Sequence, residues 1–190
     1  MTDYKDFLPY ILPEVPGCPN PTVIRSIRDT IREFCHKTWL WTEVVEYELE
    51  KDSSIIFVDM PRQSSIISLL YFVESNMEVE IEDNFIIREK RNGVESEFSQ
   101  IETEKGELRA AFKPSRISTS SPDFIYNDHI EAISFGTKAR LLINAQKQWA
   151  NPQLAIGYNQ LFNKKIVEEK IRLVKGYTKR SLKVKPRRFI

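Results

Sequence analysis

Apolar residues recur at helical spacing in two neighbouring stretches near the C-terminal end of the chain. The first stretch places its apolar face at Ile130, Ile133, Thr137 and Leu141. The second begins at Asn151-Pro152, because Asn is a good helix cap and Pro fits the first turn. Its apolar stripe comprises Leu154, Tyr158, Leu161, Phe162, Ile166, Val167, Ile171 and Val174. The pattern predicts helices at 129–147 and 152–175, packed antiparallel because the joint is short.

A third helical pattern lies near the N-terminus and supplies a partner for these two helices. Its apolar positions are Val23, Ile24, Ile27, Ile31, Phe34 and Cys35. The start signal Asn20-Pro21 precedes them, so we expect a helix at 21–38. The predicted bundle core includes Ile27, Ile31, Phe34, Leu141, Tyr158, Phe162 and Ile166. Residues 1–19 contain several Pro and Gly residues and are expected to form an extended arm with a turn.

Between the first and second helix, the hydrophobic period changes from 3.6 to 2. Short β-rich runs at 45–49, 55–58, 66–73, 77–81 and 85–87 predict strands. Asn92-Gly93 predicts a hairpin turn, and Lys105-Gly106 a second turn before a strand at 108–112. Six or seven short strands with polar turns favour an antiparallel sandwich or a small barrel. Residues 113–127 are expected to form an irregular return to the helices.

These elements predict an α+β fold in which an antiparallel helical bundle carries an inserted antiparallel β-sandwich or barrel-like domain. Residues 1–40 form the N-terminal arm and the first bundle helix, and 41–127 the inserted β domain with its return loop. Residues 128–176 form the other bundle helices. Residues 177–190 alternate apolar with basic residues, which predicts an extended C-terminal tail.

Composition narrows the class of protein further. Hydrophobic residues make up 41% of the 190 residues and aromatic residues 11%, which is typical of an ordered globular chain. No apolar run approaches the roughly 20 residues that span a bilayer, and the N-terminus does not resemble a secretory signal. Cys18 and Cys35 are too few for a disulfide scaffold, so we expect both thiols to be reduced and buried.

The net charge of +1 hides a strong separation of charge along the chain. Residues 43–107 contain 17 acidic and 6 basic residues, whereas residues 136–190 contain 2 acidic and 14 basic residues. Such a separation bears on association and orientation rather than on the fold. Solubility of each part is the simpler explanation, and contacts between copies are the more specific one.

Motifs that carry catalytic chemistry are absent from the sequence. It has no glycine-rich phosphate loop, and its two His residues, His36 and His129, are far apart and lack a zinc-binding pattern. Neighbouring residues on a helix point about 100° apart, so Cys35 and His36 do not form a nucleophile–base pair. We expect Cys35 in the core and His36 as a polar residue near a helix C-terminus. The sequence predicts no enzyme, catalytic residue, cofactor or metal site.

Two further residue types have structural interpretations. Gly136 lies inside a predicted helix, where it costs roughly 1 kcal/mol relative to Ala, so we expect another helix to approach it closely. The three tryptophans, Trp39, Trp41 and Trp149, flank helix ends and are expected to cover the core where the helices meet the sheet.

The layout resembles the head-to-tail adaptor proteins of tailed bacteriophages, also called connector or head-completion proteins. The resemblance covers nearly the whole chain: the P-G-x-P-N-P start of a helix ending IREFCHKTWLW, the inserted β region, and the basic ending LKVKPRRFI. Its most specific part is the Gly136-x-x-Ala139 helix followed by Trp149, Asn151-Pro152, Leu154-Ala155, Tyr158 and Phe162. The β region matches least.

This resemblance implies a structural virion protein at the head–tail interface, assembled in the host cytoplasm. Such a protein forms a homo-oligomeric ring, usually of twelve copies, beneath the capsid portal. One rim of the ring meets the portal protein and the other receives the next tail or stopper component. DNA passes through the central channel during ejection without specific binding, and no membrane is involved.

The tail at 177–190 is the predicted portal-docking element. It holds six basic residues and no acidic residue, a composition suited to an acidic, partly apolar groove or a free strand edge. The expected docking residues are Leu182, Lys183, Val184, Lys185, Arg187, Arg188 and Phe189. A disordered end without function is the simpler interpretation of the tail. The alternative function is a basic nucleic-acid-binding protein, because 14 bases could contact phosphates, although no known reader motif is present.

Overall fold

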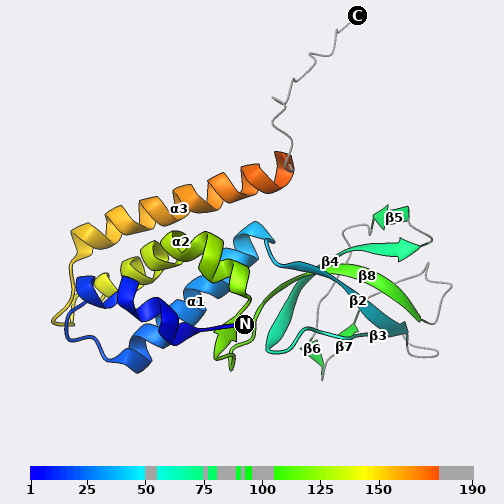
Figure 1. The fold of residues 1–190 in the computed structure, drawn as a ribbon, viewed down its shortest axis with the longest axis horizontal. Helices are drawn as coiled ribbons and strands as arrows, with labels where there is room; N and C mark the ends of the chain where they lie inside the picture. The colour runs from blue at the N-terminus through cyan, green and yellow to red at the C-terminus, as the bar shows by residue number, and fades with distance from the viewer. Residues whose placement is uncertain (50–54, 75–76, 81–88, 91–92, 96–104, 176–190) are drawn as a thin grey trace, which may run out of the picture.

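The computed structural model describes residues 1–49, 55–74, 77–80, 89–90, 93–95 and 105–175. The fold is mixed α+β, as predicted: both ends of the described chain form a helical part, and the segment between them forms a sheet (Figure 1). None of the described helices is long and apolar enough to cross a membrane.

The N-terminal segment is not the predicted extended arm. After a short strand, β1 (Thr2–Asp3), it forms two 3-10 helices, η1 (Tyr4–Tyr10) and η2 (Leu12–Glu14). Its fully buried residues are Tyr4, Phe7, Ile11 and Val15. Their spacing of three and four residues is itself a helical signal, and the prolines obscured it. The tighter 3-10 turn accommodates Pro9, so the segment packs as part of the core.

Helix α1 (Asn20–Thr38) confirms the predicted helix at 21–38. Pro19, rather than Asn20, occupies the cap position, and the helix ends where Trp39 adopts a left-handed conformation with φ of 54°. That conformation turns Trp39 outward, so 46% of its surface is exposed and its predicted role in covering the core is wrong. Trp41 is buried, as expected. Trp149 packs against the core from the segment 143–151 between the last two helices, which is not where the helices meet the sheet.

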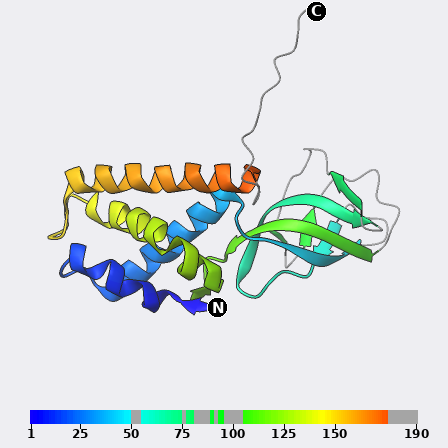
Figure 2. The same cartoon turned by 45° about the horizontal axis from the view of Figure 1, so that its top comes forward.

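Helices α2 (Asp123–Leu142) and α3 (Pro152–Lys175) lie antiparallel in both views (Figures 1 and 2). The prediction for α3 is confirmed, and the Asn151 side chain accepts a hydrogen bond of 3.2 Å from the Leu154 N–H. The prediction of 129–147 for α2 is wrong at both ends. Pro122 caps α2 and Asp123 lies in its first turn, a start signal inside the segment predicted to be irregular.

Gly136 allows the close helix packing that the sequence predicted. A Cβ atom at this position would lie 2.6 Å from the Thr30 methyl group of α1 and 2.9 Å from the Phe162 ring of α3. Both distances are far below van der Waals contact, so the three helices meet where α2 has no side chain. The predicted core residues are buried as expected, with Tyr158 half-buried at the edge.

The inserted segment forms an open antiparallel sheet in the order β5-β4-β8-β2-β3-β7-β6. Its strands are β2 (Thr42–Leu49), β3 (Ile55–Val58), β4 (Ser64–Glu74), β5 (Met77–Glu80), β6 (Glu89–Lys90), β7 (Gly93–Glu95) and β8 (Lys105–Pro114). The predicted barrel is wrong, because no pairing among the described strands joins the edges β5 and β6. Strands β6 and β7 pair antiparallel, as in the predicted hairpin, but Gly93 lies in β7 opposite Lys90 and Asn92 lies outside the described residues.

Two details of the inserted segment differ from the sequence prediction. Lys105 and Gly106 belong to strand β8 rather than to a turn. At Gly106 a Cβ atom would lie 2.9 Å from the Tyr47 ring, which explains a glycine within this strand. Part of the predicted irregular return is β9 (Ser120–Ser121), which pairs with β1 and so ties the N-terminus to the start of α2.

One continuous core joins the sheet to the helices. The Phe112 N–H donates a hydrogen bond of 2.7 Å to the Trp41 carbonyl, and the two rings lie 6.0 Å apart at their centroids. The Arg32 side chain of α1 donates to the Pro114 carbonyl at the end of β8. The sheet is therefore fixed to the end of α1.

Candidate interaction surface on helix α3

The predicted portal-docking residues, Leu182 to Phe189, lie outside the described residues. The described chain ends at Lys175, the last residue of α3. Figures 1 and 2 place this end of α3 above the junction between α1 and the sheet. The structure therefore describes α3, the helix that precedes the predicted docking segment in the chain.

The inner face of α3 packs on the bundle. Phe162 is 3% exposed, and its ring centroid lies 6.1 Å from that of Phe34 in α1. Tyr158 stacks on Phe135 of α2 at 5.9 Å, and the Lys138 ammonium lies over the Tyr158 ring. These contacts fix the N-terminal half of α3 against both other helices.

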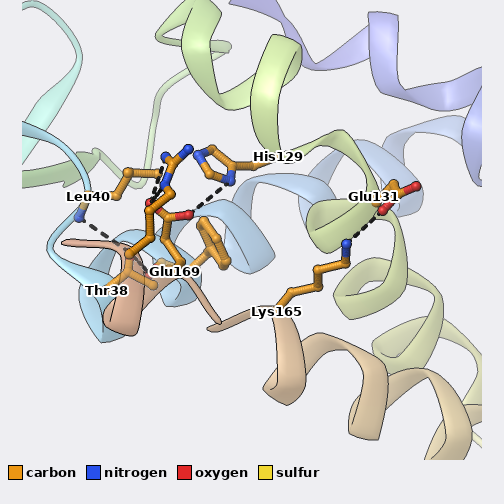
Figure 3. Close-up of polar contacts among 8 residues, drawn as sticks. Thr38, Leu40, His129, Glu131, Lys165 and Glu169 are labelled. Carbon is orange, nitrogen blue, oxygen red and sulfur yellow. Dashed lines mark hydrogen bonds and ion pairs between the residues drawn. The ribbon is translucent and has the colours of Figure 1, made fainter. Parts of the chain in front are cut away.

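A buried polar cluster holds the C-terminal half of α3 (Figure 3). Glu169 is only 6% exposed, and its carboxylate accepts a hydrogen bond of 3.0 Å from Arg172 Nε and forms an ion pair with Nη2 at 2.8 Å. The other carboxylate oxygen lies 3.9 Å from Nδ1 of His129 on α2. The His129 ring in turn lies against Phe34, with centroids 5.2 Å apart. All three helices therefore contribute to this cluster.

The surroundings of His129 favour the neutral imidazole. Burial lowers its pKa, and the nearby Glu169 carboxylate opposes this effect without reversing it. Nε2 of His129 is buried and has no hydrogen-bond partner in the structure. A small cavity of about 220 Å³ adjoins the ring, bordered by Asp128, Lys165 and Arg172. Its borders mix both signs of charge, which does not define one class of ligand.

A second ion pair ties the same two helices at the surface. Lys165 of α3 donates to the Glu131 carboxylate of α2 at 2.8 Å (Figure 3). The hydrogen bond raises the pKa of Lys165 and lowers the pKa of Glu131. The Lys165–Glu131 pair orients α3 but is exposed, so its stabilising effect is small. Near the same end of the bundle, the Leu40 N–H donates a hydrogen bond to the hydroxyl of Thr38, the last residue of α1.

The opposite side of α3, here called the α3 outer face, carries aliphatic residues that are exposed in the described part of the chain. Their exposed fractions are 56% for Ile156, 55% for Val167, 47% for Ile171 and 77% for Val174. The predicted apolar stripe thus belongs to two faces: Phe162 and Ile166 point into the core, whereas Val167, Ile171 and Val174 point to solvent. A helix with apolar residues on two sides has a second side available for a partner.

A cleft continues the α3 outer face toward the joint between α2 and α3. It has a volume of about 420 Å³, and its borders include Gly136, Ala139, Ile143, Ala155, Ile156 and Gln160. Ile143 and Ile156 are both more than half exposed at its rim. The uncovered apolar surface therefore extends from the end of α2 along the length of α3.

The basic charge of α2 and α3 is largely neutralised within the chain. At least five of the seven Lys and Arg residues in these helices have a carboxylate partner. The pairs are Lys138–Glu14, Arg140–Glu33, Lys164–Glu168, Lys165–Glu131 and Arg172–Glu169. Paired cations are less available to phosphate groups than the count of basic residues in the sequence suggests.

The two cysteines and His36, which the sequence offered as candidates for catalytic chemistry, lie where a structural role was expected. Cys35 is fully buried, as predicted, and burial raises the pKa of its thiol to about 12, which makes it a poor nucleophile. His36 is exposed in the last turn of α1. Cys18 is also buried, and both thiols are free. Within the described ranges, no three His, Cys, Asp or Glu residues are arranged to hold a metal ion.

Sequence reasoning found α3 but missed the division of its surface. The signal was present, because eight apolar positions occupy more of the helix circumference than one buried stripe requires. The His129–Glu169 contact had no sequence signal, since the two residues are 40 positions apart and the register of α2 against α3 determines it. In comparisons with known proteins, no protein-family model and no curated protein matches this chain.

Proposed function

We propose that the protein is a head-to-tail adaptor of a tailed bacteriophage, a structural virion protein that docks under the capsid portal and joins it to the tail. The observation that carries the proposal is α3: a helix fixed on one side to the bundle, open and apolar on the other, and continued directly by the basic residues 177–190. The resemblance of the sequence to such adaptors supplies the biological setting.

In this proposal the two parts of α3 have separate roles. The α3 outer face takes part in contacts within a ring of copies, twelve by the resemblance. Residues 177–190 extend from the end of the helix and dock on the portal. Leu182, Val184 and Phe189 fill apolar pockets, while Lys183, Lys185, Arg187 and Arg188 provide attraction to acidic groups. The other rim of the ring receives the next tail or stopper component, and DNA passes through the centre.

The alternative, a nucleic-acid-binding protein, receives less support from the structure. Binding to phosphates depends on cations that neutralise them, and most cations of α2 and α3 already have carboxylate partners. An adaptor needs the reverse property, a surface along which DNA slides without being held. The 17 acidic residues in 43–107 are consistent with that property.

Truncation after Gly176 tests the proposed docking role. We expect the shortened protein to fold with unchanged thermal stability, because the described fold is complete at Lys175. It should fail to bind portal-containing capsids in a sedimentation assay, and filled heads should leak DNA. Binding by the truncated protein at the level of the full chain would show that the tail is not the docking element.

Reversal of charge at two tail positions separates attraction from packing. Arg187→Glu with Arg188→Glu should weaken portal binding most at low salt, where screening is least. The matched control reverses Arg116 and Lys147, two exposed cations in loops of the described fold, and should bind as the unaltered chain does. An effect of the tail variant that does not depend on salt would indicate packing contacts instead.

A further inference from the structure

The α3 outer face combines aliphatic residues with two lysines. Val167 is 55% exposed, and Lys164 and Lys170 lie on either side of it around the helix. Both lysines are exposed. Lys164 is paired with the exposed Glu168 at 3.9 Å, and an exposed pair of this kind has a small stabilising effect, so a carboxylate of a partner can replace it. Six residues of α-helix rise about 9 Å, so the two ammonium groups are spread along the axis by about that distance.

A row of three carboxylates crosses the sheet of the same chain. Glu46 of β2 lies directly opposite Glu107 of β8, and the Asp59 N–H at the end of β3 donates a hydrogen bond of 2.9 Å to the Glu46 carbonyl. The three residues therefore occupy neighbouring positions on adjacent strands. All three are exposed, and none has an ion-pair partner among the described residues. Like charges in adjacent strands destabilise a sheet, so the row has a local cost.

The carboxylate row fits the α3 outer face in charge and in dimension. Strands lie about 4.8 Å apart, so three neighbouring strands spread their carboxylates over about 10 Å, close to the spacing of Lys164 and Lys170. By strand alternation, Val44 lies on the same side of the sheet as Glu46, and it is 42% exposed. Arg109 lies opposite Val44 and reduces the negative charge at one end only. The same side thus offers both an aliphatic contact and negative charge.

We infer that a second copy of this chain covers the α3 outer face, with Lys164 and Lys170 set against the row of Asp59, Glu46 and Glu107 on its sheet. This inference rests on the proposed ring and names the two surfaces that form it. The surfaces belong to different parts of the chain, so the contact is heterologous: each copy uses α3 toward one neighbour and its sheet toward the other. Contacts of this kind generate a ring when the rotation between copies closes.

Charge exchange between the two surfaces tests the inference on the full chain without a portal. One variant carries Lys164→Glu and Lys170→Glu, and the other carries Glu46→Lys and Glu107→Lys. Each variant alone brings like charges together, so its self-association, measured by sedimentation over a range of protein concentrations, should weaken about tenfold or more. An equimolar mixture restores opposite charges at every contact and should associate as the unaltered chain does.

The control variant, Arg116→Glu with Lys147→Glu, lowers the net charge by the same amount as the Lys164/Lys170 variant and should leave self-association unchanged. Circular dichroism of each variant should match the unaltered chain. The inference is overturned if the unaltered chain stays monomeric at all concentrations, if either variant associates normally, or if the mixture does not recover. The truncation at Gly176 tests the adaptor proposal separately. If truncation abolishes portal binding while charge exchange still restores association, both the interface and the adaptor proposal are supported. If the truncated chain binds the portal normally, only the docking role of the tail is overturned.

Discussion

At the scale of single residues, Gly136 determines how closely the three helices approach. A methyl group there would overlap Thr30 and Phe162, so the glycine is required by packing and not by backbone conformation. In the sequence, Gly136 was recognisable as a glycine inside a predicted helix, where it is less favourable than Ala. The residues that it contacts were not, because they depend on the crossing of α1, α2 and α3.

We predict that Gly136→Ala destabilises the protein although Ala is the better helix former. The gain in helix propensity is about 1 kcal/mol, whereas overpacking a core contact costs about 1–3 kcal/mol. Gly157→Ala on α3 is the matched control, because a Cβ there meets nothing within 4 Å. It should raise the free energy of unfolding by up to about 1 kcal/mol. Chemical denaturation measures both, and stabilisation by both changes would contradict the packing account.

His129 should make the stability of the protein depend on pH. Its pKa is lowered in the folded state by burial, so the unfolded chain takes up a proton first as the pH falls. Stability from the neutral imidazole is then complete above the ordinary His pKa of about 6.5 and decreases as the pH falls below it. His129→Gln should flatten this part of the profile, as measured by urea unfolding. His36, whose pKa is also lowered, remains as a smaller source of the same slope.

A pH profile that is the same with His129 and with Gln would show that the imidazole is already protonated or fully solvated. The decrease below about pH 4.5 should persist in both proteins, because the pKa values of Glu33 and Glu131 are lowered. At Glu33 burial raises the pKa, but Lys37 and Arg140 together outweigh it, and at Glu131 the hydrogen bond from Lys165 lowers it. This second region provides an internal reference for the first.

At the scale of elements, α3 is the helix with two different faces. Its start followed from Asn151-Pro152, and the structure confirms the predicted range of 152–175. The division into a buried and an open face did not follow, since period alone places Phe162 and Val167 in one stripe. Burial is set by the angle at which α3 lies across α2, and that angle depends on Gly136 and on the His129–Glu169 contact.

Substitutions on the two faces of α3 should differ strongly in effect. Phe162→Ala removes a buried ring and should cost about 3–5 kcal/mol. Val167→Ala removes exposed atoms and should change the stability of the isolated chain by less than about 0.5 kcal/mol. Thermal or chemical unfolding distinguishes them. Equal effects would mean that the α3 outer face is covered within the chain itself.

At the scale of the whole molecule, the sequence predicted an α+β fold with a sheet inserted in a helical part, and this is observed. The prediction was wrong in two segments that contain prolines. The N-terminal segment forms two packed 3-10 helices, and Pro122 caps the start of α2 rather than lying in an irregular loop. The barrel failed because strand number does not determine closure. Closure depends on pairing between edge strands, and alternating apolar residues carry no information about that pairing.

Our central proposal is that this chain forms a ring on the portal of a tailed bacteriophage. Electron microscopy of the full-length protein mixed with the portal of the same phage tests it most directly. We expect a closed ring of twelve copies around a central opening, seated on one face of the portal. Binding to the portal should be lost when the chain ends at Gly176. Portal particles that remain bare in the presence of excess full-length protein, or single copies bound without a ring, would contradict it.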